Sequence, residues 1–98
     1  MTYGDSRRKF AVMVAKLILF AIENGYEVAL DDGKCRTGHI RNSYHYIALA
    51  QDINLYKDGV YLTRTADHLP LGEYWEKMGG TWGGRWDDGN HYSLGEGR

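Results

Sequence analysis

The chain has 98 residues, a formal net charge of −1, 43% hydrophobic residues and 26% charged residues. This length predicts a single domain, residues 1–98, and the ordinary composition excludes disordered and fibrous classes. The small net charge gives no electrostatic sign of a nucleic-acid binder. The single cysteine, Cys35, excludes an internal disulfide framework and a Cys-rich zinc knuckle.

The N-terminal segment is predicted to be a helix that begins at Asp5 or Ser6 and runs to about Asn24. Gly25 follows where a left-handed residue commonly ends a helix. Apolar residues recur at three- and four-residue spacing and form one broad face: Phe10, Met13, Val14, Leu17, Phe20 and Ala21. We therefore expect this helix to pack across a sheet.

The same segment superficially resembles an export signal, because Arg7-Arg8-Lys9 precedes an apolar run. Lys16 interrupts that run, which is too short to span a bilayer, and no small-residue cleavage site follows. The pattern therefore favours an amphipathic helix of a protein without stable membrane insertion, made in the cytoplasm without a signal peptide.

Two strands and a polar loop are predicted next. Residues 26–30 alternate and are rich in strand formers, and residues 31–42 form a polar loop with glycines. Residues 48–55 alternate with a period of two, which places Asp52 and Asn54 on one face with two alanines and places Ile53 and Leu55 on the other. A carboxylate between small residues is unusual for a face filled by core packing.

The second half begins with a turn. Residues 57–59 (Lys-Asp-Gly) predict a hairpin that pairs residues 60–62 back onto the preceding strand. Pro70 suits the first turn of a short helix over residues 71–80. From Gly72 onward the chain is rich in Gly and Trp, which indicates either a flexible tail or a tightly folded loop lining a cleft. Its three Trp favour the loop, because indoles are stabilised by burial.

Three residues form the most specific chemical set: His45, Asp52 and His91. Two imidazoles and a carboxylate are enough to hold a catalytic zinc that keeps its fourth position open for water. Asp88, three residues before His91, is a candidate general base for that water. The alternative is that the histidines are solvated and that residues 87–89 are only a turn, and spacing alone does not decide between the two readings.

A resemblance to a known family favours the metal site. The string Ser43-x-His45-x-x-Ala48-x-Ala50-x-Asp52, followed by Asp88-x-x-His91, resembles the D-alanyl-D-alanine carboxypeptidase family of zinc peptidases. It is most similar to the phage L-alanyl-D-glutamate endopeptidase (endolysin) branch. The family has glycine where Ala48 stands, and Asp88 agrees with this branch, since the carboxypeptidase and dipeptidase branches have Glu. Further motifs of the family match this chain in the same order, at residues 54–55, 69–72, 75 and 79–85.

The resemblance implies roles residue by residue. It assigns His45, Asp52 and His91 as zinc ligands and Asp88 as the base. The family also has an arginine that meets the substrate's carbonyl or carboxylate, for which Arg36 is the best-placed match and Arg41 a weaker one. Weaker candidates for substrate contacts share an aromatic ring or a hydroxyl near the motifs: Ser43, Trp82, Tyr92 and His68. Core packing is an equal alternative for Trp82 and Tyr92.

The resemblance also implies the fold and substrate. We expect an α+β domain, a small antiparallel sheet with the long N-terminal helix on one face and a zinc cleft on the other, as in this family and the related hedgehog domain. The expected substrates are peptidoglycan stem peptides at the cell wall, cut by a monomer. A D-Ala-D-Ala carboxypeptidase, a non-catalytic zinc-binding module and a thiol peptidase using Cys35 remain alternatives, and the sequence does not select the bond.

Overall fold

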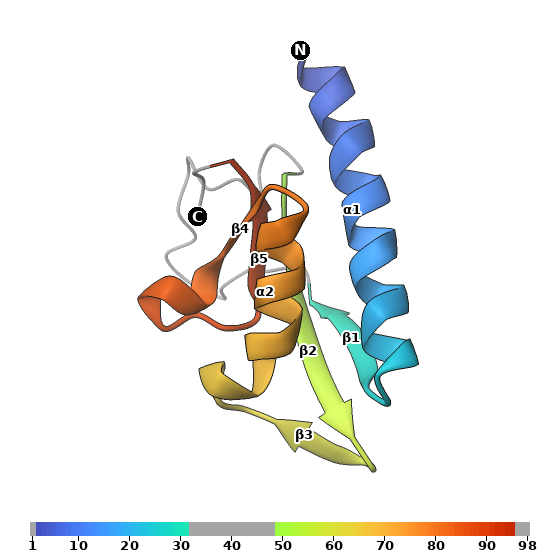
Figure 1. The fold of residues 1–98 in the computed structure, drawn as a ribbon, viewed down its shortest axis with the longest axis vertical. Helices are drawn as coiled ribbons and strands as arrows, with labels where there is room; N and C mark the ends of the chain where they lie inside the picture. The colour runs from blue at the N-terminus through green and yellow to red at the C-terminus, as the bar shows by residue number, and fades with distance from the viewer. Residues whose placement is uncertain (1, 32–48, 96–98) are drawn as a thin grey trace.

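The computed structural model describes residues 2–31 and 49–95 and has the predicted α+β fold (Figure 1). In chain order the elements are α1 (Tyr3–Glu23), β1 (Glu27–Asp31), β2 (Ala50–Lys57), β3 (Val60–Leu62), the 3-10 turn η1 (Thr65–His68), α2 (Leu69–Lys77), β4 (Gly80–Trp82), the 3-10 turn η2 (Gly83–Trp86) and β5 (His91–Leu94). Within the described ranges, no helix combines the length and apolar character needed to cross a membrane.

Helix α1 begins earlier than predicted, and its N-cap is Thr2 rather than Asp5 or Ser6. The Thr2 hydroxyl accepts a hydrogen bond from the Asp5 backbone N–H at 3.0 Å. The Asp5 carboxylate accepts one from the Thr2 N–H at 3.1 Å, so the two residues form a capping box. Asp5 therefore takes part in the cap as the third residue of the helix and not as the N-cap residue.

The C-terminal end of α1 confirms the role predicted for Gly25, which has a φ of 88°. The Gly25 N–H donates to the Ile22 carbonyl and the Tyr26 N–H to the Ala21 carbonyl, which is the Schellman pattern. The chain then turns directly into β1.

The sheet is antiparallel, with the strand order β1-β2-β5-β4 and with β3 paired to β2. The β2–β3 hairpin forms as predicted, because Asp58 and Gly59 both adopt the positive φ that its two-residue turn needs. Strand β2 is central: Asp52 lies opposite Asp31 of β1 on one side and opposite His91 of β5 on the other.

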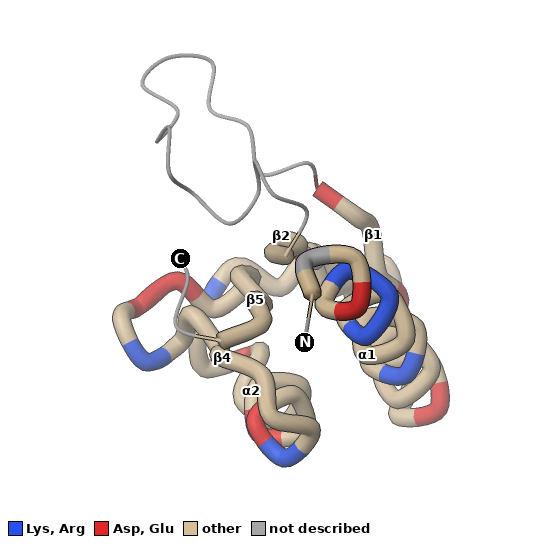
Figure 2. The backbone as a smooth tube through the Cα atoms, turned by 90° about the horizontal axis from the view of Figure 1, so that it is seen from above, with Lys and Arg blue, Asp and Glu red and all other residues tan. Residues whose placement is uncertain are grey.

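Both helices lie against the same face of the sheet (Figure 2). The core contains the predicted apolar residues of α1 and β2, among them Leu17, Ile53 and Leu55, each with no exposed surface. Trp75 of α2 lies edge-on to the Tyr92 ring of β5 at 5.8 Å between centroids, and its indole N–H donates to the Ser93 carbonyl. Burial of these side chains stabilises the sheet against the helices.

The Gly/Trp-rich segment is folded and its residues 87–90 line a cleft, as the favoured alternative predicted, but it also contributes two strands, β4 and β5, and the turn η2. Its glycines allow the indole rings to lie against the backbone. A Cβ on Gly80 would lie 2.1 Å from the Trp75 ring, and one on Gly84 would lie 2.2 Å from the Trp82 ring. Strands of three and four residues between such glycines are too short to show a period of two.

Gly72→Ala tests this packing. An added Cβ at Gly72 would lie 2.1 Å from the Trp82 ring, so we expect a loss of about 1–3 kcal/mol in the free energy of unfolding, as for other overpacked cores. Urea denaturation measures it. The control is Gly4→Ala in α1, where the nearest atom is 3.5 Å away; it is expected to be neutral or slightly stabilising. Equal stability of both variants would contradict the packing described.

Candidate metal centre and adjoining cleft

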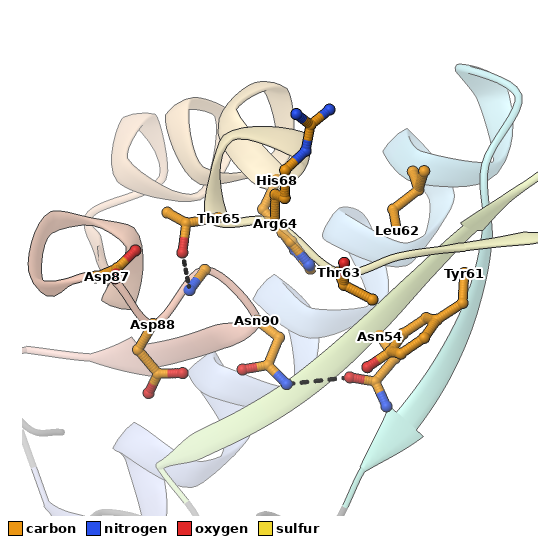
Figure 3. A pocket seen from close by; sticks show the side chains of 11 residues that line it. Asn54, Tyr61, Leu62, Thr63, Arg64, Thr65, His68, Asp87, Asp88 and Asn90 are labelled. Carbon is orange, nitrogen blue, oxygen red and sulfur yellow. Dashed lines mark hydrogen bonds between the residues drawn. The ribbon is translucent and has the colours of Figure 1, made fainter.

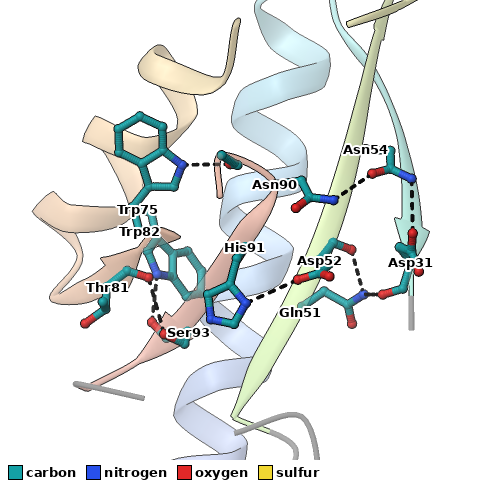
Figure 4. Close-up of polar contacts among 11 residues, drawn as sticks. Asp31, Gln51, Asp52, Asn54, Trp75, Thr81, Trp82, Asn90, His91 and Ser93 are labelled. Carbon is teal, nitrogen blue, oxygen red and sulfur yellow. Dashed lines mark hydrogen bonds and ion pairs between the residues drawn. The ribbon is translucent and has the colours of Figure 1, made fainter. Parts of the chain in front are cut away.

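Asp52 and His91 are brought together by the pairing of β2 with β5, where they lie directly opposite each other (Figure 4). Alternation along the strands places them on the face that does not carry Ile53 and Tyr92. The Asp52 Oδ1 and His91 Nδ1 atoms are 3.3 Å apart, and the two side chains are only 18% and 5% exposed. The pair is thus a carboxylate and an imidazole held close together with little access to water.

This pair fits two ligands of a zinc ion by its donor chemistry. Bonds of about 2.0–2.2 Å at a tetrahedral angle place two donors about 3.3 Å apart, which is the separation observed between Asp52 and His91. The third predicted ligand, His45, lies outside the described residues. Among residues 2–31 and 49–95, no three His, Cys, Asp or Glu side chains gather as a metal site. A site with three protein ligands therefore needs a further ligand from outside these ranges.

The loop between η2 and β5 carries Asp88 and is held by its backbone. The Asp88 N–H donates to the Gly83 carbonyl at 2.9 Å, and the His91 N–H donates to the Asp88 carbonyl at 3.1 Å. The Gly89 N–H donates to the Thr65 hydroxyl at 3.2 Å. A Cβ on Gly83 would lie 2.3 Å from the Asp88 carbonyl oxygen, so this close turn requires glycine. These bonds fix the positions of the Asp88 and His91 backbones relative to each other.

A chain of side-chain amides ties the same loop to β2 and β1 (Figure 4). The Asn90 amide donates to Asn54 Oδ1 at 3.0 Å, and the Asn54 amide donates to Asp31 Oδ2 at 3.4 Å. The Ile53 backbone N–H donates to the Asn90 carbonyl at 2.8 Å. Asn54 is two residues from Asp52 on the same face, so this network fixes His91 relative to Asp52.

A cleft of about 180 Å³ adjoins this loop, between the end of β3, the turn η1 and residues 87–90 (Figure 3). Asp88 forms part of its wall, together with polar side chains of Thr63, Thr65 and Asn90. Asp88, the predicted base, therefore borders this cleft.

His68 lies in the wall of the same cleft and is only 4% exposed. Its Nδ1 is 2.9 Å from the Tyr92 phenol oxygen. Burial lowers the pKa of His68 to about 4, against a small opposing effect of the Asp67 charge. Burial also raises the pKa of the Tyr92 phenol. At neutral pH, both groups are therefore uncharged.

The lowered pKa of His68 predicts that the folded state is less stable at acidic pH. The unfolded chain binds a proton below pH 6.5 and the folded chain only below about 4, so the free energy of unfolding falls by about 2–3 kcal/mol on acidification through this window. His68→Gln removes this contribution, and its free energy of unfolding is expected to depend less on pH between 6.5 and 4. Urea titrations of both proteins with a chelator present measure the difference; parallel pH profiles would contradict it.

The remaining predicted site residues divide into two groups. Trp82 and Tyr92 are 2% and 0% exposed and belong to the core, which favours core packing over substrate contact. Ser43, His45, Arg36, Arg41 and Cys35 lie outside the described residues. The sequence did not indicate Asn90 or Thr65, and for Asn54 its signals were the shared face with Asp52 and the family resemblance at residues 54–55.

The fold brings a buried carboxylate and imidazole, Asp52 and His91, together beside a polar cleft, which defines a candidate hydrolase site. A family model described as D-alanyl-D-alanine carboxypeptidase matches residues 37–94, more than half of the chain. The chain belongs to this peptidase family. A search for similar curated proteins found no match.

Proposed function

We propose that the protein is a zinc-dependent peptidoglycan peptidase that hydrolyses a stem-peptide amide bond, the L-Ala-D-Glu bond of the endolysin branch. The observation that supports this proposal most directly is the Asp52–His91 pair, with 3.3 Å between Asp52 Oδ1 and His91 Nδ1, in a member of this peptidase family. Asp88 lies on the wall of the adjoining cleft, where a proton acceptor is needed. The proposed site of action is the cell wall.

The proposed mechanism assigns each step to a residue of this chain. His45, Asp52 and His91 would hold the zinc, which supplies an activated water and polarises the scissile carbonyl when bound. The Asp88 carboxylate accepts a proton from the attacking water as the new C–O bond forms. It then returns the proton to the leaving nitrogen as the C–N bond breaks. Arg36 counters the negative charge on the carbonyl oxygen.

The placement of Asp88 supports its role as base rather than as a turn residue. Its backbone N–H and carbonyl are both bonded, to Gly83 and His91, so the side chain projects from a fixed point. Asp88 is exposed at the cleft, whereas Asp52 is partly buried against His91. A proton acceptor needs access to water and substrate, while a metal ligand benefits from exclusion of water.

A D-Ala-D-Ala carboxypeptidase is the second candidate, because the matching family model carries that description. The same ligands and base would serve either reaction, since both hydrolyse an amide. The difference lies in which peptide bond the cleft and residues 32–48 place beside Asp88.

Mass spectrometry of fragments from defined peptidoglycan tests the proposal. We expect stem peptides released with a new amino terminus on D-Glu, each cut adding one water. Release of free D-alanine instead would identify a carboxypeptidase. No new fragment from purified peptidoglycan, with zinc present, would contradict a peptidase of either kind and favour a non-catalytic module.

A further inference from the structure

The wall of the cleft contains a histidine that the proposed mechanism does not use. We propose that this cleft is a subsite for the uncharged backbone amides of the stem peptide, with His68 as a fixed hydrogen-bond donor. This inference rests on the proposed function and specifies how the same site holds its substrate. Three features support it: the orientation of His68, the neutral lining of the cleft and the position of Asp88.

The orientation of His68 follows from its contact with Tyr92. A neutral imidazole has one nitrogen that donates and one that accepts. The two atoms are 2.9 Å apart, and we assign the Tyr92 O–H as the donor to His68 Nδ1, because a phenol is the better donor and an imidazole nitrogen the better acceptor. The imidazole proton is then on Nε2. The bond to Tyr92 and the burial of the ring both favour this tautomer.

The lining of the cleft is mostly neutral and polar. Thr63 and Thr65 contribute hydroxyls, Asn54 and Asn90 contribute amides, and Tyr61 contributes a phenol (Figure 3). Hydroxyls and amides both donate and accept, as the N–H and C=O of a peptide require. Arg64 at the rim is 82% exposed and near Asp67, so its charge is screened by solvent. Asp87 and Asp88 add carboxylates at one edge, so the lining matches a peptide backbone better than an anionic group.

The size and position of the cleft set how much peptide it holds. Its volume of about 180 Å³ is below the roughly 300–1,000 Å³ typical of pockets for drug-sized ligands. It therefore takes one or two amino-acid residues. Because Asp88 is part of its wall, we place there the stem-peptide residues next to the L-Ala-D-Glu pair, which the dipeptide lacks. Such a contact is made equally in the ground state and the transition state, so it acts on KM more than on kcat.

Two enzymes and two substrates test the subsite. The substrates are the L-Ala-D-Glu dipeptide and the full stem peptide; the variant is His68→Phe, which removes the N–H and keeps a flat ring. Wild type is expected to have a KM about fivefold to tenfold lower for the full stem peptide, the value of one buried hydrogen bond. In His68→Phe, that advantage is lost while the dipeptide KM is unchanged. His68→Gln, which keeps an N–H donor, restores most of it.

A second variant covers the case in which His68→Phe does not fold. Thr63 is exposed, so Thr63→Val removes a cleft hydroxyl at little cost in stability. It is expected to raise the KM for the full stem peptide about twofold to threefold, whereas Thr81→Val on β4, away from the cleft, does not. An unchanged ratio of the two KM values in Thr63→Val, or in a folded His68→Phe, with the dipeptide still hydrolysed, would overturn the subsite. Absence of hydrolysis by wild type would instead reject the proposed function.

Discussion

Asp88→Asn is expected to lower kcat on purified peptidoglycan by about 10²–10⁴, the usual contribution of a positioned general base. Asparagine has nearly the same shape but cannot accept a proton at neutral pH. The turn that holds residue 88 uses backbone groups, the bond from the Asp88 N–H to Gly83 and the bond to the Asp88 carbonyl from His91. The substitution should therefore leave the fold and the zinc content unchanged.

The neighbouring residue provides a matched control. Asp87 has a left-handed backbone with a φ of 64°, a conformation that asparagine also tolerates. Asp87→Asn removes the same charge one residue away, and its kcat is expected to stay within about twofold of wild type, since it lacks the base role. If Asp88→Asn retains near wild-type turnover, the assignment of the base is wrong.

Asp52→Asn is expected to remove most zinc binding. Loss of a group that only orients a metal ligand typically costs about 10–100-fold in affinity, so loss of a ligand itself should exceed about 100-fold. The affinity of purified protein for zinc, measured by competition with a coloured chelator, reports the change. Activity at low zinc should fall with it, and added zinc should stabilise wild type against urea more than the variant.

Asp58→Asn is the control for this change. Asp58 lies in the exposed β2–β3 turn with a φ of 52°, where asparagine is favourable. It removes one negative charge far from His91 and should keep the wild-type affinity for zinc. Equal zinc affinity of Asp52→Asn and wild type would remove Asp52 from the proposed ligand set.

Features that depend on neighbours in sequence were predicted well. The spacing of Phe10, Met13 and Leu17 predicted the buried face of α1, and Gly25 ends that helix with the expected positive φ. The Asp58-Gly59 turn and the alternation in β2 were also correct. Each of these follows from local backbone geometry or side-chain period.

Features that depend on contacts distant in sequence were not predicted. The Thr2 cap is a local exception, missed because Asp5 and Ser6 are equally good capping residues by type. Strands β4 and β5 form because β5 pairs with β2 and buries Tyr92, which no short segment reveals. The bonds of Asn54 to Asn90 and of His68 to Tyr92 join residues far apart in the chain.

The residues of the candidate site were predicted in part, and mainly from the resemblance to a known family. Alternation placed Asp52 on a face of small residues, but only the β2–β5 register brings its carboxylate to His91. The cleft beside Asp88 combines residues from three separate elements, so no motif could have indicated it. The roles of His45 and Arg36, in residues 32–48, rest on the sequence resemblance.

Removal and return of zinc test the central claim most directly. The protein is stripped with a chelator, dialysed and assayed on purified peptidoglycan while zinc is titrated back. We expect stripped protein to be inactive, with activity returning in proportion to added zinc and reaching its maximum at one zinc per chain. Full activity of thoroughly stripped protein would contradict a zinc site formed by His45, Asp52 and His91.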